Sequence, residues 1–485
     1  MLNKIKKLIP LKLFHFFQPV YHFMVALAAA ISYGFPSRKM IVIGVTGTAG
    51  KTSTVYLLAK MLSAAGYKTG FTSTAVFSDG DEEWLNDKKM TMPGRFFIQK
   101  TLKLMLKNNC RYAIVETTSE GIKQFRHRFI NYDTIVFTNL YPEHIEAHGN
   151  FEKYKEAKGK LFAHLKDCSV KYVNEKRQVV KPMSNLKKLE LTRVVKTIIA
   201  NGDDENAPYF LGFWAEAKIV CSFRAGFSLD ELLRQLPSEA AVKDFSLVKG
   251  ADISSGVEGI SFRIEGGEQD LIKLNLLGEF NAFNALAAYA VGINQNINSE
   301  KLRLGLESVR GLAGKIELIA AGQNYTAIVD YSFEPMALAK LYQALALVPR
   351  EKVIHLLGST GGGRDAARRP ILGKIAADNA DIVIVTNEDP YDEDPAQIIN
   401  QVAAGAEEAG KTLNVDLFKI LDRREAVKKA LELAKEGDLL LFTGKGAEQA
   451  ICGPNGTKLP WDERLVVHAE IMARIDIDKA AIKDI

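Results

Sequence analysis

Residues 41–54 read IVIGVTGTAGKTST, and this spacing predicts a phosphate-binding loop. An apolar, β-branched run ends in a glycine-rich turn, after which Gly50, Lys51 and Thr52 open a helix. Glycines let backbone N–H groups close on an anion, the lysine reaches the terminal phosphates, and the threonine hydroxyl is offered to Mg²⁺. We therefore expect this loop to bind a nucleotide. Its predicted nucleotide-binding residues are Gly47, Thr48, Gly50, Lys51, Thr52 and Ser53.

Two polar clusters follow short strands further along the chain. Glu116 follows the predicted strand Tyr112–Val115, and His144 follows the predicted strand Thr134–Thr138. The carboxyl ends of parallel strands meet at one edge of a sheet, where ligands bind. We therefore expect Glu116 to hold Mg²⁺ and His144 to face a ligand, although a surface histidine is the alternative for His144 and for His148. From the residues alone, the lysine-rich helix 154–162 is a solvated amphipathic face.

The order of the predicted elements indicates an α/β fold. Helical and strand patterns alternate after the loop, which predicts a P-loop ATPase-like central domain with a mostly parallel sheet over residues 39–310. Gly311–Gly314 is the predicted boundary. A second βα series then predicts a Rossmann-like C-terminal domain over residues 311–485. It begins with a strand at Tyr325–Asp330 and ends with one at Asp438–Thr443.

The composition narrows the class and compartment of the protein. Of 485 residues, 47% are hydrophobic and 25% are charged, as in an ordinary globular protein. A net charge of +5 without a long basic tract argues against a nucleic-acid partner. The four cysteines are widely spaced and form no CxxC, which argues against a zinc site or disulfide framework and fits a reducing, cytoplasmic location.

Residues 1–38 form a basic, apolar segment. Four lysines precede the apolar stretch Leu13–Phe35, whose cleanest part, Val20–Phe35, is 16 residues long. A bilayer span needs about 20 residues, and no clear cleavage site of a signal peptide follows. Three interpretations stay open: a helix packed on the ATPase core, an interfacial anchor through residues 1–36 at the inner face of the membrane, and a true span.

Several motifs together resemble the Mur ligase family, most closely its MurE type, over roughly residues 40–470. That type adds the third amino acid to UDP-N-acetylmuramoyl-dipeptide. Besides the phosphate-binding loop, the matching stretches are Thr91-Met92-Pro93, Glu116–Arg126, TNLYPEHIEAHG at 138–149, AKGKLF at 157–162, GEFNAFNALAA at 278–288, VDYSFEP at 329–335, GGGRDAARRP at 361–370 and GKGAE at 444–448.

The resemblance implies a role for each matching residue. Lys51 would bind the γ-phosphate, and two Mg²⁺ ions would be held by Thr52, Glu116, His144 and a carbamylated Lys158. The implied adenine, phosphate and ribose contacts of ATP are Asn281, Asn284, Lys315 and Asp330. The implied acceptor-peptide contacts are Thr91, Thr118, Gln124 and Arg126. The implied amino-acid site comprises Arg364, Arg369, Asp389, Gly444 and Glu448.

The departures from the family pattern concern the two substrates. The diaminopimelate-type DNPR motif is Glu388-Asp389-Pro390-Tyr391 here, so the arginine that pairs a distal carboxylate is absent. Its acidic pair favours a cationic amino acid, lysine or ornithine, over meso-diaminopimelate. The family's separate UDP-sugar-binding domain also needs more than the 40 or so residues before the loop, and we expect it to be lacking.

Taken together, the sequence predicts an ATP-dependent carboxylate–amine ligase that adds an amino acid to a muramoyl-dipeptide through an acyl phosphate. Its partners would be ATP, the amino acid and the muramoyl-peptide precursor. The alternatives are a folylpolyglutamate-synthetase-like ligase and a ligase that acts on a lipid-linked cell-wall precursor. Outside this class, a P-loop NTPase switch is the rival, and amino-acid-dependent release of ADP distinguishes it.

Overall fold

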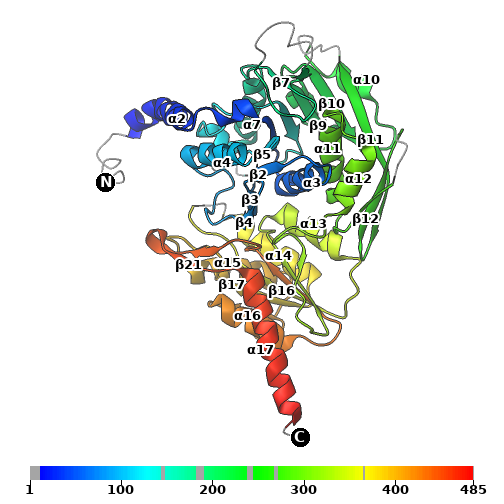
Figure 1. The fold of residues 1–485 in the computed structure, drawn as a ribbon. Coiled ribbons are helices and arrows are strands. Elements are labelled where there is room, and N and C mark those ends of the chain that lie inside the picture. The colour runs from blue at the N-terminus through cyan, green and yellow to red at the C-terminus, as the bar shows by residue number, and fades with distance from the viewer. Residues whose placement is uncertain are drawn as a thin grey trace.

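The computed structural model describes residues 11–143, 148–181, 191–237, 244–266, 271–363 and 366–483, with side chains described from residue 17 to residue 476. Two α/β halves follow one another along the chain, and each is built around its own sheet (Figure 1). The predicted positions His144 and Arg364 lie outside the described residues.

The first half contains an eleven-stranded sheet with the order β13-β12-β11-β10-β9-β6-β1-β5-β2-β3-β4. Its strands from β11 to β2 are parallel, and a short antiparallel meander closes each edge. The strands are β1 Ile41–Thr46, β2 Thr69–Thr72, β3 Val76–Ser78, β4 Glu83–Leu85, β5 Tyr112–Glu116, β6 Thr134–Phe137, β9 Thr197–Asn201, β10 Ala217–Ser222, β11 Phe245–Gly256, β12 Gly259–Ile264 and β13 Leu271–Leu274.

Helices cover both faces of this sheet. The helices are α2 Leu11–Tyr33, the 3-10 turn η1 Pro36–Lys39, α3 Lys51–Ala64, α4 Arg95–Lys107, α5 Ser119–Lys123, α7 Phe151–Leu165, α9 Ala207–Leu211, α10 Leu229–Arg234, α11 Phe280–Asn294 and α12 Ser299–Glu307. A separate pair of short strands joins β7 Lys171–Val173 to β8 Thr192–Val194.

The central strand β1 shows why helices lie on both faces. Ile41, Ile43 and Val45 belong to the apolar core shared with α3, α11 and α12, whereas Val42 belongs to the core shared with α4, α7 and α9. Successive side chains of a strand point to opposite faces, and a strand buried on both faces is apolar throughout. The apolar run that ends in the phosphate-binding loop is therefore the middle of the sheet.

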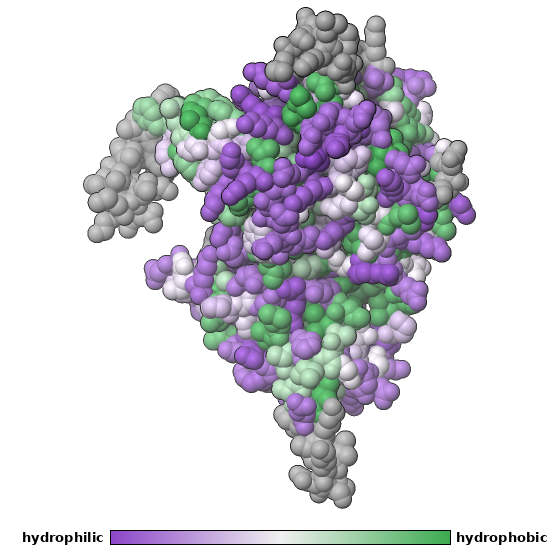
Figure 2. Space-filling model, viewed as in Figure 1, coloured by the Kyte–Doolittle hydropathy of each residue, from purple (hydrophilic) through white to green (hydrophobic). Residues whose placement is uncertain are grey.

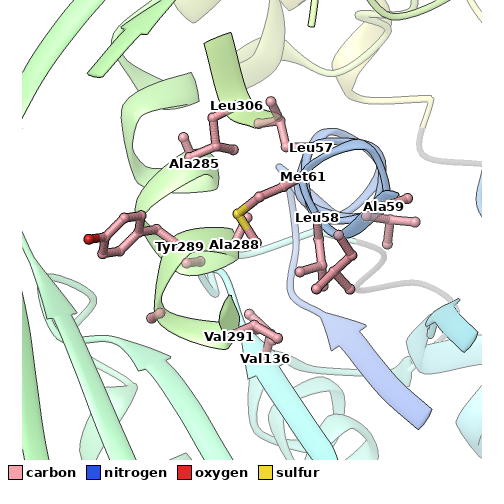
Figure 3. Close-up of a cluster of buried hydrophobic side chains, with 14 of the residues drawn as sticks. Leu57, Leu58, Ala59, Met61, Val136, Ala285, Ala288, Tyr289, Val291 and Leu306 are labelled. Carbon is pink, nitrogen blue, oxygen red and sulfur yellow. The ribbon is translucent and has the colours of Figure 1, made fainter. Parts of the chain in front are cut away.

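The helix that begins at the loop is held by tight packing (Figure 3). Met61 and Leu57 of α3 pack against Ala285 and Ala288 of α11 and Leu306 of α12. These contacts bring the first turn of α11 next to the phosphate-binding loop.

The second half contains a six-stranded sheet with the order β14-β15-β19-β16-β17-β18, parallel except for the edge strand β14. The strands are β14 Glu317–Leu318, β15 Thr326–Asp330, β16 Val353–Leu357, β17 Ile382–Thr386, β18 Leu417–Ile420 and β19 Leu439–Thr443, followed by the hairpin β20 Ala450–Cys452 and β21 Lys458–Pro460 with η3 Pro454–Gly456 between them. Its helices are α13 Pro335–Leu345, α14 Arg368–Asn379, α15 Pro395–Glu408, α16 Arg423–Leu433 and α17 Glu463–Lys483.

The predicted fold class is confirmed, since both halves are α/β and mostly parallel. The predicted division at residue 310 falls between the last strand of the first sheet and the first strand of the second. Within the N-terminal segment, residues Leu11–Tyr33 form the helix α2, which projects from the side of the first half beside α4 (Figure 1). In the part of the chain that the structure describes, no helix is both long and apolar enough to cross a membrane.

Candidate active site

The phosphate-binding loop joins the end of β1 to the start of α3, and two of its residues must be glycine. Gly50 has φ +78°, and a Cβ there would lie 2.4 Å from Oδ1 of Asn284. Gly47 has φ +155°, and a Cβ would lie 1.9 Å from Oγ1 of Thr138. Both positions combine a backbone conformation that suits glycine with no room for a side chain. The loop is therefore shaped by its contacts with neighbouring elements.

Asn139, which follows β6, fixes the loop by hydrogen bonds. Its Oδ1 accepts from the backbone N–H of Ala49 at 2.8 Å, and its carbonyl accepts from the N–H of Thr48, also at 2.8 Å. Lys51 Nζ donates to the carbonyl of Thr48 at 2.6 Å, so its ammonium lies against the loop. The polar cluster that the sequence places at this strand end thus supports the loop directly.

Thr52 and Glu116 form the candidate Mg²⁺ site. The Thr52 hydroxyl donates to Glu116 Oε2 at 3.0 Å, and Glu116 is buried at the end of β5. Thr74 donates to the same carboxylate from its backbone N–H and its hydroxyl, each at 2.8 Å. Mg²⁺ prefers oxygen ligands and keeps several waters, so this hydroxyl–carboxylate pair fits it.

No larger metal cluster is present among the residues that the structure describes. None of their His, Cys, Asp and Glu side chains gather in a group of three or more that could hold a metal ion. His144 lies outside those residues. His148 is buried, and its Nε2 lies 3.1 Å from Oγ of Ser119, so the surface interpretation of His148 was wrong.

Lys158 of α7 is buried rather than solvated, so the amphipathic-face interpretation of this helix was wrong for Lys158. Only 1% of Lys158 is exposed, and its Nζ donates to the carbonyl of Gly47 at 2.7 Å. The same Nζ lies 4.6 Å from the ring centroid of Tyr154. Burial, aided by the charge of Lys51, lowers the pKa of Lys158 well below its ordinary value. Burial in this setting favours the uncharged form of the amine more than it does for an exposed lysine.

A cavity of about 1040 Å³ opens between the two halves of the chain. Ala49, Gly50 and Ser53 line one side of it. Asn281 and Asn284 of α11 continue that wall, while Lys315 and Asp330 line it from the second half. Its size suits a nucleotide, and its walls come from the carboxyl ends of parallel strands.

The polar groups of this cavity are positioned by one another. Asn284 Nδ2 donates to Asn281 Oδ1 at 3.0 Å, and Asn281 Nδ2 donates to the Leu277 carbonyl at 2.8 Å. Asp330 is buried and accepts from the N–H groups of Ile316 and Ser332, at 2.8 Å and 2.6 Å. Because both carboxylate oxygens are fixed in this way, the side chain has a single orientation towards the cavity.

Comparisons with known proteins agree with this geometry. The Mur ligase middle domain matches residues 45–292, and the Mur ligase glutamate ligase domain matches residues 314–446. The UDP-N-acetylmuramyl-tripeptide synthetase of Roseiflexus sp. (strain RS-1) is 36% identical over 448 residues, which cover 90% of this chain and 80% of that protein. This chain belongs to the Mur ligase family.

Other relatives and solved structures extend the comparison. The UDP-N-acetylmuramoyl-L-alanyl-D-glutamate–2,6-diaminopimelate ligase of Geobacillus kaustophilus (strain HTA426) is 30% identical over 451 residues, covering 93% of this chain and 82% of that protein. MurF from Acinetobacter baumannii has a TM-score of 0.59 at 17% identity, covering 87% of this chain and 77% of that one. The ADP complex of Mycobacterium tuberculosis folylpolyglutamate synthase has the same TM-score and identity, covering 87% and 91%. These two structures share the fold of this Mur ligase.

The ligase brings its predicted acceptor-peptide residues together at the edge of the first half. Gln124 Oε1 accepts from Arg126 Nη2 at 2.7 Å, and Arg126 also donates to the Met92 carbonyl. The Thr91 hydroxyl lies 2.8 Å from the hydroxyl of Thr74, which itself donates to Glu116 of the candidate Mg²⁺ site. Thr118 caps α5 by accepting from the N–H of Gly121 at 3.2 Å.

A buried ion cluster lies at the predicted amino-acid site of the ligase. Lys445 Nζ donates to Asp389 Oδ1 at 2.9 Å, to Glu448 Oε2 at 2.8 Å and to the Ala450 carbonyl at 2.8 Å. Lys89, from the first half, donates to Asp389 Oδ2 and the Ala450 carbonyl at 2.8 Å and also to Glu448. Although burial alone lowers it, Glu448 and Asp389 raise the pKa of Lys89 above its ordinary value. Two lysines therefore already neutralise these two carboxylates.

The other predicted amino-acid residues differ in their surroundings. Arg369 is buried and donates to Gln401 and Glu393, each at 2.7 Å, so it is held within the second half. Gly444 has φ +99°, and a Cβ there would lie 2.3 Å from Glu388 Oε2. Burial, followed by the charge of Asp389, raises the pKa of Glu388.

Sequence reasoning missed Thr74, Lys89 and Lys445 as site residues. Thr74 follows β2, so the rule that parallel strands end at the ligand-binding edge could have found it. Lys445 lies inside the GKGAE stretch, and that motif is the signal that could have identified it. Lys89 carries no signal, because its partner Asp389 is 300 positions away along the chain.

Proposed function

We propose that this Mur ligase joins an amino acid to a muramoyl-dipeptide, with ATP as the energy source. The observation that carries the proposal is the cavity between the halves, where Gly50 and Ser53 face Lys315 and Asp330. The names of its relatives supply the acceptor, since they include a UDP-N-acetylmuramyl-tripeptide synthetase. The amino-acid site lies in the second half, beside the Asp389–Glu448 cluster.

The chemistry follows from the groups around the loop. An oxygen of the acceptor carboxylate attacks the γ-phosphorus of ATP, and the bond to ADP breaks, leaving an acyl phosphate. The neutral amine of the amino acid then attacks the acyl carbon, and phosphate and a proton leave as the amide forms. Lys51 and the N–H groups of the loop would stabilise charge on the transferred phosphoryl group. Contacts from both halves would hold the reactants in line and exclude water.

Thr52 and Glu116 would hold one Mg²⁺, whose positive charge would offset that of the phosphates. We propose further that Lys158 is carbamylated and, with His144, holds a second ion. The proposal is supported by the burial of the Lys158 amine and its lowered pKa, since CO₂ combines with an uncharged amine. Bond formation between Nζ and CO₂ releases a proton and leaves an anionic oxygen ligand.

Asn281 and Asn284 would face the adenine and Asp330 the ribose, while Lys315 would contact the phosphates. Thr91, Thr118, Gln124 and Arg126 would bind the acceptor carboxylates. The identity of the amino acid stays a prediction. Lys89 and Lys445 already pair with Asp389, so the charge of this carboxylate no longer favours lysine or ornithine by itself. The remaining support for a cationic amino acid is that Tyr391 stands where the diaminopimelate-type motif has arginine.

We also propose that the protein acts in the cytoplasm, since this location fits the proposed substrates.

The test is release of ADP by purified protein, with each amino acid crossed against muramoyl-dipeptide acceptors. We expect release to require both substrates, with the tripeptide as product. ADP release that is independent of both would support an NTPase switch instead. Lys51→Ala should abolish the reaction, whereas Lys60→Ala, on the same helix but paired with Glu83 at the surface, should not. Wild-type turnover in Lys51→Ala would overturn the nucleotide assignment.

A further inference from the structure

Helix α2 carries an apolar stripe on the side that faces away from the protein. Val20, Tyr21, Met24 and Ile31 are 59%, 54%, 55% and 59% exposed. Their spacing of three, four and seven residues places them on one face of a helix. We call these four residues the α2 stripe. Figure 2 shows apolar residues on this projecting helix.

The opposite face of α2 is already occupied by the protein. Ala26, Ala29 and Ala30 are buried, and the helix packs beside α4. The ring of Phe23 meets that of Phe129 edge-on, with centroids 5.2 Å apart. The helix therefore has a fixed orientation, and the α2 stripe is the side that this packing leaves exposed.

The charge around α2 identifies what the stripe fits. Residues 1–40 contain six lysines and arginines and no aspartate or glutamate, while the remaining 445 residues contain 57 basic and 58 acidic residues. The whole excess of positive charge thus belongs to the segment that carries the stripe. Between Leu13 and Ser37 there is no charged residue, so α2 is uncharged apart from Lys12 in its first turn, and Arg38 and Lys39 are exposed in η1, just beyond its C-terminal end.

We propose that the α2 stripe docks on the surface of a bilayer that contains anionic lipids. A helix with an apolar face and basic flanks lies in the plane of the interface, with its apolar side chains among the acyl chains and its cations at the headgroups. A second protein copy would not explain why one sign of charge is gathered here. The proposal places α2 at the surface of the bilayer, and among the described residues no helix is both long and apolar enough to cross it.

Docking through α2 would bring the acceptor site to the membrane surface. Nδ1 of His22, on the packed side of α2, lies 2.6 Å from Nη2 of Arg95. The same Nη2 donates to the carbonyl of Gln124, whose side chain holds Arg126. A single residue, Arg95, thus links α2 to the predicted acceptor contact Gln124.

The test is co-sedimentation of the full chain with vesicles of phosphatidylcholine alone or with added phosphatidylglycerol. We expect binding to the anionic vesicles and weaker binding to the neutral ones. Val20→Glu with Met24→Glu should reduce that binding at least tenfold. The matched control is Val415→Glu with Leu421→Glu, which changes two apolar residues of the second half that are at least as exposed, at 69% and 55%, and should leave binding unchanged.

The charges are tested separately. Arg38→Gln with Lys39→Gln should weaken binding to anionic vesicles roughly thirtyfold, since each basic residue near the surface contributes about a fivefold factor. Equal melting temperatures would establish that the variants fold. Failure of the wild type to bind anionic vesicles, or equal binding by wild type and the stripe variant, would overturn the proposal. A dimer that the stripe variant loses, without vesicle binding, would assign the stripe to self-association and overturn it too. Vesicle binding is measured without substrates, so its outcome is independent of the ligase activity.

Discussion

Replacing Lys89 with methionine should weaken the association of the two halves of the ligase. Lys89 lies in the first half, is 6% exposed by its side chain, and donates all three of its N–H bonds to acceptors in the second half. Methionine keeps the length of the side chain but removes the charge. Asp389 and Glu448 would then share the single ammonium of Lys445.

The size of the effect follows from the burial of the cluster. Removing one partner of a buried ion pair costs about 3–5 kcal/mol, and the lower end applies because Lys445 still pairs with both carboxylates. About 3 kcal/mol corresponds to a change of roughly a hundredfold in the equilibrium constant between the arrangement described above, in which Lys89 joins the two halves, and one in which the halves separate. Since catalysis needs groups from both halves, we expect kcat/KM for the amino acid to fall by a similar factor.

The assay is the rate of ADP release at saturating ATP and acceptor, with the radius of gyration in solution measured on the free protein. Lys88→Met is the matched control, because Lys88 is next to Lys89 in the sequence but is 41% exposed and pairs at the surface with Asp87. Such a pair contributes at most about 1 kcal/mol, so kcat/KM should stay within a fewfold of wild type. Wild-type kcat/KM and an unchanged radius in Lys89→Met would refute the reasoning. A rise in kcat/KM would refute it as well, because it would mean that the Lys89 ammonium obstructs the amino-acid site.

Three further predictions concern the first half. Lys158→Ala should be nearly inactive, and millimolar acetate or formate should partly restore ADP release by supplying the oxygens of the missing carbamate. Gly50→Ala should weaken ATP binding at least tenfold by calorimetry, because its Cβ would lie 2.4 Å from Oδ1 of Asn284. His127→Phe should reduce the loss of unfolding free energy on acidification, as measured by urea titrations at several pH values.

The sign of the last effect follows from burial. Burial, followed by the charges of His164 and Arg128, lowers the pKa of His127 well below its ordinary value. Below about pH 6.5 the unfolded chain binds a proton that the folded chain does not. Stability contributed by the neutral ring is therefore present above that pH and is lost as the pH falls, by up to about 1.4 kcal/mol per unit. An identical pH dependence in His127→Phe would contradict this.

Controls with the same chemistry accompany these variants. Lys155→Ala changes a lysine of the same helix that is paired with Glu152 and should keep full activity. Gly66 has φ +95°, and no atom lies within 4 Å of an added Cβ. Gly66→Ala should therefore lower the stability of the fold through backbone strain alone and leave ATP affinity unchanged. If acetate raised ADP release just as much in a variant that retains Lys158, such as Lys155→Ala, the result would speak against the carbamate.

The sequence predicted the parts of the fold that repeat a local pattern. The buried strand β1 and the glycine turn before Lys51 follow from a β-branched run and a fixed spacing of glycines. The helix around Lys158 could not be interpreted locally, because its lysines look alike in sequence. Only the packing of α7 under the phosphate-binding loop distinguishes the buried Lys158 from the partly exposed Lys155.

Contacts between distant segments were beyond the reach of sequence patterns. Each half of the cluster of Lys89, Asp389 and Lys445 has an ordinary local sequence, and only the tertiary arrangement brings the charges together. The antiparallel strands β3 and β4 at one edge of the first sheet were missed for a related reason. Three-residue strands such as β3 and β4 are too short to display an alternation of polar and apolar residues.

The uneven distribution of charge has a consequence for handling the protein. With its first 40 residues, the chain has a net charge of +5 and an isoelectric point near 8.7, but the rest alone has 57 basic and 58 acidic residues. Mutual repulsion between molecules at neutral pH therefore comes almost wholly from the segment that also carries the apolar stripe. A truncation that removes residues 1–40, and α2 with them, would leave a protein with almost no net charge at neutral pH, where colloidal stability is lowest. Substituting the stripe while keeping the lysines is the better route to a well-dispersed enzyme.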